Sequence, residues 1–185
     1  MYELLILGAL MAHERSGYKL GLILEASLEP RRKISNGVIY PMLHKLEDAG
    51  FITVRVDQSG GRSAKIATIT PAGRARLHVL MQQPVPEDAK RESTYRFKFR
   101  ALSYEPASVQ RAVLSDFADV SEQDALLYAR VHRHLSERLA AGERSADVTS
   151  ALRMFELQES LAQTKRDWAK AQMAQLPSHD EMPSE

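Results

Sequence analysis

Polar and basic side chains gather in one stretch of the N-terminal half, where their types and spacing suit contacts with phosphate groups and base edges. The helical spacing of this stretch is set by four apolar residues, Ile39, Met42, Leu43 and Leu46. At about 100° per residue, the face opposite that set carries Asn36, Gly37, Tyr40, His44 and Lys45. Amide, hydroxyl, imidazole and ammonium groups are the types that contact nucleic acid. The sequence therefore predicts a nucleic-acid contact face on one helix.

Further basic groups lie on both sides of this stretch. Arg31, Arg32 and Lys33 come just before it, and Arg62 and Lys65 follow it around a pair of glycines. Cationic side chains neutralise phosphates and release counterions, which strengthens binding at low salt. The local charge pattern thus supports the same prediction, although the whole chain has a formal charge of only +1.

Other chemistry finds little support in the sequence. The chain has no cysteine, which excludes disulfides, thiolate metal sites and cysteine nucleophiles. His132 and His134 are two positions apart and diverge on a helix, so a metal pair there is not expected. The sequence has no Gly-rich phosphate loop, nucleophile elbow or His-Glu-x-x-His spacing. We predict neither an enzyme nor a bound cofactor or metal.

Composition and charge divide the chain of 185 residues, of which 44% are hydrophobic and 26% charged. Residues 1–80 hold 11 Lys and Arg against 7 Asp and Glu, a net +4, whereas the rest hold 14 against 17, a net −3. Two prolines, Pro84 and Pro86, interrupt the helical pattern. We predict domains at residues 1–83 and 84–177 and a frayed tail at 178–185. The apolar opening is too short to cross a bilayer, so a cytoplasmic protein is expected.

The first half predicts three helices and then a β-hairpin. Residues 2–12 are apolar nearly all round, which predicts a buried first helix. Ser16 is a good N-cap for a second helix, which Pro30 ends. The apolar residues of this second helix recur at helical spacing: Tyr18, Leu20, Ile23, Leu24 and Leu28. Two β-branched runs, residues 51–56 and 66–70, flank a polar turn. Thr70 and Pro71 then open a further helix. This order predicts a winged helix-turn-helix, whose third helix enters the major groove.

The second half predicts helices almost throughout, so the fold class is mainly α with one small hairpin. The expected helices cover residues 87–102, 106–142 and about 147–176. Helices of such length usually pair with another chain, and the last one has an approximate heptad seam. We predict a helical dimerisation domain that uses Phe117, Val131, Leu135, Met154, Leu157, Leu161 and Trp168.

The stretch from Ser35 to Ile52 resembles the signature of PadR-like transcriptional regulators. The Ser16-Gly17-Tyr18 opening, Gly61-Arg62 and the run from Ile69 to Gly73 follow in the family's order. The resemblance implies that the third helix begins near Ser35, whereas the spacing alone would begin it at Pro41. It also implies a wing position for Arg62 and pairing of protomers through the C-terminal helices. The DNA-binding set predicted from both arguments is Lys33, Ser35, Asn36, Tyr40, His44, Lys45, Arg62 and Lys65.

The predicted fold and charge pattern favour a homodimeric, sequence-specific regulator that binds a pseudo-palindromic DNA operator. The resemblance implies that it is a repressor and that a small effector, expected to be aromatic, releases it. One alternative is a sensor of planar hydrophobic compounds at the dimer seam, where Trp168 would stack on the ligand. Another is a protein-interaction adaptor with the same fold and no role on DNA. Such an adaptor would be expected to present an apolar docking face, whereas the predicted face is polar and basic.

Overall fold

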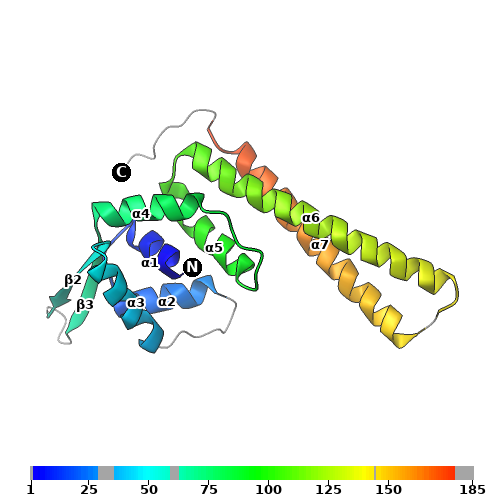
Figure 1. The fold of residues 1–185 in the computed structure, drawn as a ribbon, viewed down its shortest axis with the longest axis horizontal. Helices are drawn as coiled ribbons and strands as arrows, with labels where there is room; N and C mark the ends of the chain where they lie inside the picture. The colour runs from blue at the N-terminus through cyan, green and yellow to red at the C-terminus, as the bar shows by residue number, and fades with distance from the viewer. Residues whose placement is uncertain (1, 29–35, 59–62, 144, 178–185) are drawn as a thin grey trace. The chain divides into compact units, whose positions relative to one another are not determined.

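The computed structural model describes residues 2–28, 36–58, 63–143 and 145–177. The chain divides into two compact units, one within Met1–Val109 and the other within Gln110–Asp180. Helices predominate in both, and a small sheet belongs to the first (Figure 1). The first unit ends at Val109 and therefore extends beyond residue 83, where the composition predicts a domain boundary. Compact units need not coincide with domains that act separately, so the boundary at residue 83 remains a prediction.

The first unit begins with the three predicted helices: α1, Tyr2–Leu10; α2, Gly17–Ser27; and α3, Asn36–Asp48. Residues 4–10 of α1 are all buried, as an all-round apolar helix requires. Ser16 caps α2 by accepting a hydrogen bond from the Lys19 backbone N–H at 3.3 Å. Helix α3 runs through Pro41, so its start agrees with the family resemblance and not with the spacing argument. Tyr18 is 70% exposed and does not join the buried face of α2.

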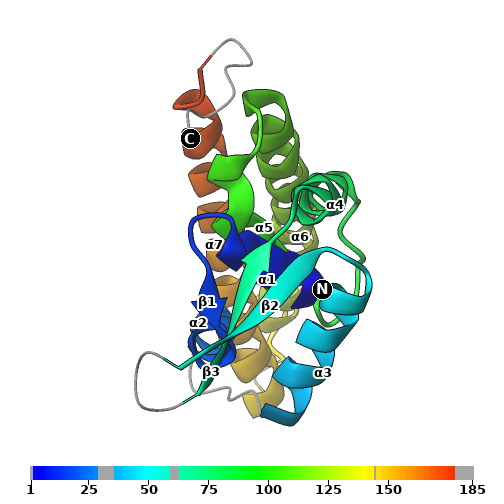
Figure 2. The same ribbon diagram turned by 90° about the vertical axis from the view of Figure 1, so that its left-hand side faces the viewer.

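The sheet has three antiparallel strands in the order β1-β3-β2 (Figure 2). The predicted hairpin is present as β2, Ile52–Asp57, and β3, Ala64–Ile69. The third strand, β1, Arg15–Ser16, was not predicted from the sequence; it pairs with Ala67 and Ile66 of β3. A strand of two residues is too short to show the alternation of apolar and polar residues that predicts a strand, so β1 is recognised only from its pairing with β3. This strand joins the start of α2 to the wing.

Two further α-helices complete the first unit, α4, Pro71–Gln82, and α5, Arg91–Ala101. A short 3₁₀ helix, η1, Leu102–Tyr104, directly follows α5. The side chain of Thr70 accepts from the Gly73 N–H at 3.0 Å, and Pro71 occupies the first turn, as predicted. Helix α5 starts four residues later than expected and packs on α1, where the Tyr2 and Phe97 ring centroids lie 6.2 Å apart. The buried Lys98 donates to the Met81 carbonyl oxygen at 2.9 Å.

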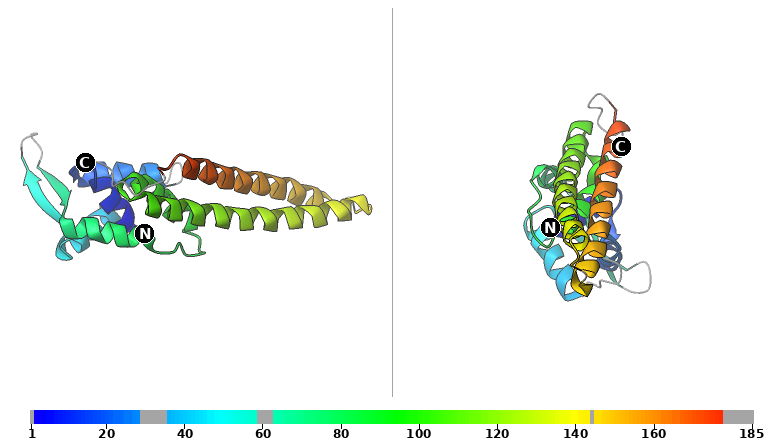
Figure 3. Two further views of the ribbon diagram at one scale, coloured as in Figure 1. Left: turned by 90° about the horizontal axis from the view of Figure 1, so that it is seen from above. Right: turned by 90° about the vertical axis from the view of Figure 1, so that its right-hand side faces the viewer.

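The second unit is a pair of long antiparallel helices (Figures 1 and 3). It contains α7, Ala146–Ala174, and all of α6, Ala107–Ala140, except its first three residues. Ser145 caps α7 by accepting from the Val148 N–H at 3.1 Å. Near the other end of the pair, Arg166 Nη1 donates to Glu122 Oε2 at 2.9 Å. Small buried residues, among them Ala118, Ala125, Ala162 and Ala169, let the helices approach closely. Over the described residues, no helix combines the length and the apolarity that a bilayer crossing needs.

Candidate nucleic-acid interface

Helix α3 has one buried and one exposed face, divided as its spacing predicts. Ile39 is 1% exposed, and Leu43 and Leu46 are also buried. Met42, the fourth member of the apolar set, is half-buried. The exposed face carries Gly37, Tyr40, His44 and Lys45, which are the predicted contact positions whose side chains the structure describes. This face therefore presents hydrogen-bonding and cationic groups to a partner.

Three of the predicted residues, Tyr40 and His44 of α3 and Lys65 of β3, line one narrow crevice between that helix and the sheet. Its free volume of about 10 Å³ is about the size that holds a single water molecule. The wing thus packs closely against α3. Residues more than 20 positions apart in the chain therefore line the same crevice.

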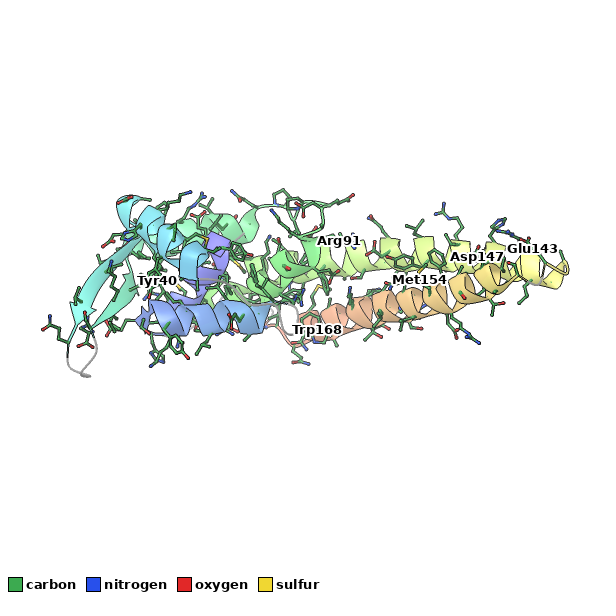
Figure 4. All side chains as sticks on the ribbon, turned by 90° about the horizontal axis from the view of Figure 1, so that it is seen from below. Tyr40, Arg91, Glu143, Asp147, Met154 and Trp168 are labelled. Atoms are coloured by element: carbon green, nitrogen blue, oxygen red, sulfur yellow. The ribbon has the colours of Figure 1, made fainter. Side chains whose placement is uncertain are left out.

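Tyr40 rests on the start of α2. A methyl group added to Gly17 would lie 3.0 Å from Tyr40 Cε1 and 3.4 Å from its hydroxyl oxygen. In Figure 4, Tyr40 lies between α3 and α2, in agreement with this contact. This contact of Gly17 was not predicted from the sequence, where Gly17 is only part of a motif. Gly17 leaves room for the aromatic ring and so helps to fix the direction in which Tyr40 points.

The wing is tied to the turn before α2 by Glu14, which the sequence analysis also overlooked. One carboxylate oxygen of Glu14 accepts from Arg55 Nη2 on β2. The other accepts from the Thr68 hydroxyl on β3 at 3.3 Å. All three side chains are partly or largely exposed, so the stabilisation is small and decreases as salt rises. The contacts nevertheless orient the two strands that carry the wing.

Acidic groups also lie on or beside α3, and they modify its electrostatic character. His44 Nδ1 lies 3.8 Å from Glu47 Oε2, so a protonated His44 would be paired within its own helix. Asp48 is exposed at the last residue of the helix. The positive charge of the face is therefore carried by Lys45 and, from the wing, by Lys65.

Several predicted DNA contacts cannot be placed. Lys33, Ser35 and Arg62, together with the flanking Arg31 and Arg32, lie outside the described residues. Asn36 is the first residue of α3. The predicted tail at 178–185 also lies outside the described part of the chain.

The predicted dimer residues fall into two groups. Within the second unit, Leu135 and Phe117 are buried and Val131 is half-buried, and the Phe117 ring meets Trp168 edge-on at 6.2 Å between centroids. The residues on α7 are exposed by 42–56%: Met154, Leu157, Leu161 and Trp168. Their separations of three, four and seven residues put them along one side of the helix. Figure 4 labels two of them, Met154 and Trp168, on α7. We call these four residues the α7 stripe.

Comparison with known proteins finds similar sequences and structures. Residues 6–79 match the transcriptional regulator PadR-like family. The negative transcriptional regulator PadR of Bacillus subtilis is 36% identical over 107 residues, which cover 56% of this chain and 59% of that protein. The chain thus spans less than two thirds of the length of this relative.

Solved structures of B. subtilis PadR are also similar. The complex with operator DNA is 24% identical, with a TM-score of 0.43, and covers 94% of this chain and 97% of that one. The complex with p-coumaric acid is 25% identical, with a TM-score of 0.40, and covers 93% and 96%. The matched family and the curated relative are transcriptional regulators and not enzymes, in agreement with the sequence analysis. Residues 6–79, which include the helix α3 and the hairpin strands described above, are similar to the PadR-like family of transcriptional regulators.

Proposed function

We propose that the protein is a homodimeric transcriptional regulator that acts on double-stranded DNA in the cytoplasm. The observation that carries the proposal is the exposed face of α3 within the family-matched residues, where Tyr40 and His44 lie beside Lys65 of the wing and Lys45 is also exposed. A helix of this kind reads base edges in the major groove while basic groups around it contact phosphates. The polar character of the face argues against an adaptor, whose docking surface would be more apolar.

The α7 stripe supports the homodimer. Four large apolar side chains exposed along one helix are costly in water and are commonly covered by a partner helix. A twofold dimer would present two copies of α3 to half-sites about one turn of DNA apart. Two copies also provide the specificity that one small module lacks. In this proposal residues 84–177 act as the dimerisation domain and residues 1–83 as the DNA-binding domain.

We further propose that the regulator is a repressor released by a small aromatic compound. The 36% identical relative is named a negative regulator, which supports repression. A ligand releases DNA when it binds better to a conformation that does not fit the operator. The seam alternative, in which Trp168 stacks on a planar ligand, is less favoured because Trp168 already meets Phe117 within one chain.

The test is binding of the purified protein to a labelled fragment of the DNA upstream of its own gene, followed by fluorescence anisotropy over a salt series against random competitor. We expect specific, dimeric binding that weakens steeply as salt rises. Tyr40→Ala should weaken operator binding about tenfold or more, as loss of a base or phosphate contact does. It should leave the circular dichroism spectrum and the dimer unchanged.

Binding to the upstream fragment that is no tighter than to random DNA would contradict a self-regulating repressor. If binding to a library of random sites also selects no motif, sequence-specific regulation is wrong and the adaptor hypothesis gains. Unchanged operator affinity in Tyr40→Ala would remove the assignment of Tyr40 to the interface.

A further inference from the structure

The start of α2 carries two exposed side chains that the interface described above does not use. Tyr18 is 70% exposed, and Lys19 beside it is also exposed. Within the described residues, neither the Tyr18 hydroxyl nor the Lys19 ammonium group has a hydrogen-bond or ion-pair partner. A largely exposed tyrosine gains little of the free energy that burial of its ring provides. The two side chains therefore offer a hydroxyl and a positive charge to a partner outside the described part of the chain.

Two contacts place this end of α2 beside the proposed DNA-binding face. Gly17, the residue before Tyr18, lies so close to α3 that an added methyl group would be 3.4 Å from the Tyr40 hydroxyl oxygen. Ser16 pairs with Ile66 of β3, a strand of the wing (Figure 2). Both exposed side chains thus follow directly on a segment of backbone that is fixed to α3 and to the wing.

The acidic side chain before α2 does not cancel the charge of Lys19. This residue, Glu14, is engaged by the wing, since its two carboxylate oxygens accept from Arg55 and Thr68. The helix cap uses only backbone of Lys19: the Ser16 hydroxyl oxygen accepts from the Lys19 N–H at 3.3 Å. The ammonium group of Lys19 is therefore left to interact with a negatively charged partner.

The neighbourhood of α3 indicates what that partner is. The major groove is about 12 Å wide, close to the diameter of one α-helix with its side chains, so a helix in the groove has a phosphate strand on each side. In a helix-turn-helix, the first helix of the pair crosses one of these strands. Here that first helix is α2, and its start is the end that lies against Tyr40.

We propose that Tyr18 and Lys19 contact the DNA phosphates on the flank of α3, the hydroxyl by donating to a phosphate oxygen and the ammonium group by ion pairing. The inference rests on the proposed function, since it extends the same interface from two elements, α3 and the wing, to three. Phosphates are the same in every sequence, so these contacts contribute affinity and position the protein but do not select the operator.

The test is fluorescence anisotropy of the full-length chain with the labelled upstream fragment and with a random duplex of the same length. Tyr18→Phe removes only the hydroxyl, and we expect it to weaken both complexes about tenfold, as loss of a hydrogen bond to a charged group does. Lys19→Gln should make the slope of log affinity against log salt less negative by about 1.8 in a dimer, about 0.9 for each protomer. In both variants the ratio of the two affinities should stay at the wild-type value.

Leu22→Ala is the matched control. Leu22 lies one helical turn after Tyr18 and is 49% exposed, but it has no group that can bind a phosphate. This variant should bind both DNAs as the wild type does. Tyr18→Phe keeps the aromatic ring, so its circular dichroism spectrum and its dimer should be unchanged, and a loss of DNA affinity then cannot come from misfolding.

The proposal is overturned if Tyr18→Phe binds both DNAs as the wild type does, or if Lys19→Gln keeps the wild-type salt slope. A loss confined to the upstream fragment would also overturn it, because the two side chains would then read bases. So would an equal loss in Leu22→Ala, which would indicate an apolar contact. A wild-type chain that binds neither DNA contradicts the proposed function itself, whereas normal wild-type binding with unaffected variants contradicts this inference alone.

Discussion

At the scale of single residues, the direction of Tyr40 depends on a residue of a neighbouring helix that has no side chain of its own. Gly17 leaves room for the Tyr40 ring, and a side chain there must displace the ring, because an added methyl group would lie 3.0 Å from it. Gly17 is the first residue of α2, directly after the Ser16 cap. Loss of this glycine should therefore affect the interface without removing any group from it.

Gly17→Ala tests this coupling. Alanine favours a helix interior by about 1 kcal/mol over glycine, and less at the first residue of a helix, so the variant should have a free energy of unfolding close to that of the wild type in a urea titration. Operator affinity should nevertheless fall, by a smaller factor than in Tyr40→Ala. In the double variant the two effects should not add, because Gly17→Ala acts only through the ring that Tyr40→Ala removes. Additive losses in the anisotropy assay would mean that Gly17 acts independently of Tyr40.

A second glycine supports the wing by close contact. A methyl group on Gly73 would lie 2.1 Å from the Phe51 carbonyl oxygen, a backbone atom that cannot rotate away. Gly73→Ala should therefore destabilise the protein by about 2 kcal/mol or more, since the start of α4 must move away from the segment before β2. The neighbouring Ala72 is exposed, so Ala72→Ser is a control that should leave the unfolding midpoint nearly unchanged. Equal midpoints for Gly73→Ala and the wild type in urea would rule out this close contact.

At the scale of elements, α7 carries both the core of its own unit and the proposed dimer contact. Val148, Ala162 and Ala169 are buried, whereas the α7 stripe is 42–56% exposed. One face of the helix therefore packs within the chain and another is left for a partner. A helix whose apolar residues are spread over two faces has a weak overall amphipathic pattern, so sequence alone does not separate the two roles.

Leu157→Glu tests the stripe. A carboxylate in the middle of an apolar helix pair must be desolvated, so sedimentation should change from dimer to monomer at micromolar concentration. Operator affinity should fall strongly with it, because the monomer has one α3. Thr149→Glu places the same charge on an exposed position of α7 outside the stripe and should remain dimeric. A dimer that persists in Leu157→Glu would move the contact to another surface.

At the scale of the whole molecule, the proposed dimer doubles every phosphate contact. Each contact lowers the slope of log affinity against log salt by about 0.9, so Lys65→Gln should make the slope less negative by about 1.8 if two protomers bind together. Lys170, exposed on α7, provides the control: Lys170→Gln should leave the slope unchanged. A change of about 0.9 would indicate that only one wing contacts DNA.

Most elements of the fold were predictable because their signals are local. Ser16, Thr70 and Ser145 each cap the helix that follows, and the apolar spacing of α3 orients its two faces. The strands of the hairpin follow from two β-branched runs around a polar turn. Such signals depend on residues only a few positions apart in the sequence, so the elements that they predict do not depend on which other elements pack against them.

The arrangement of the candidate site required the tertiary structure. The sequence alone established which α3 residues are exposed and that basic groups flank them. Only the fold brought Gly17 against Tyr40, Lys65 beside His44 and Glu14 to both wing strands. These neighbours come from separate elements, and their distances depend on how the elements pack. Periodicity within one element carries no record of that packing, because the same helix face fits many partners.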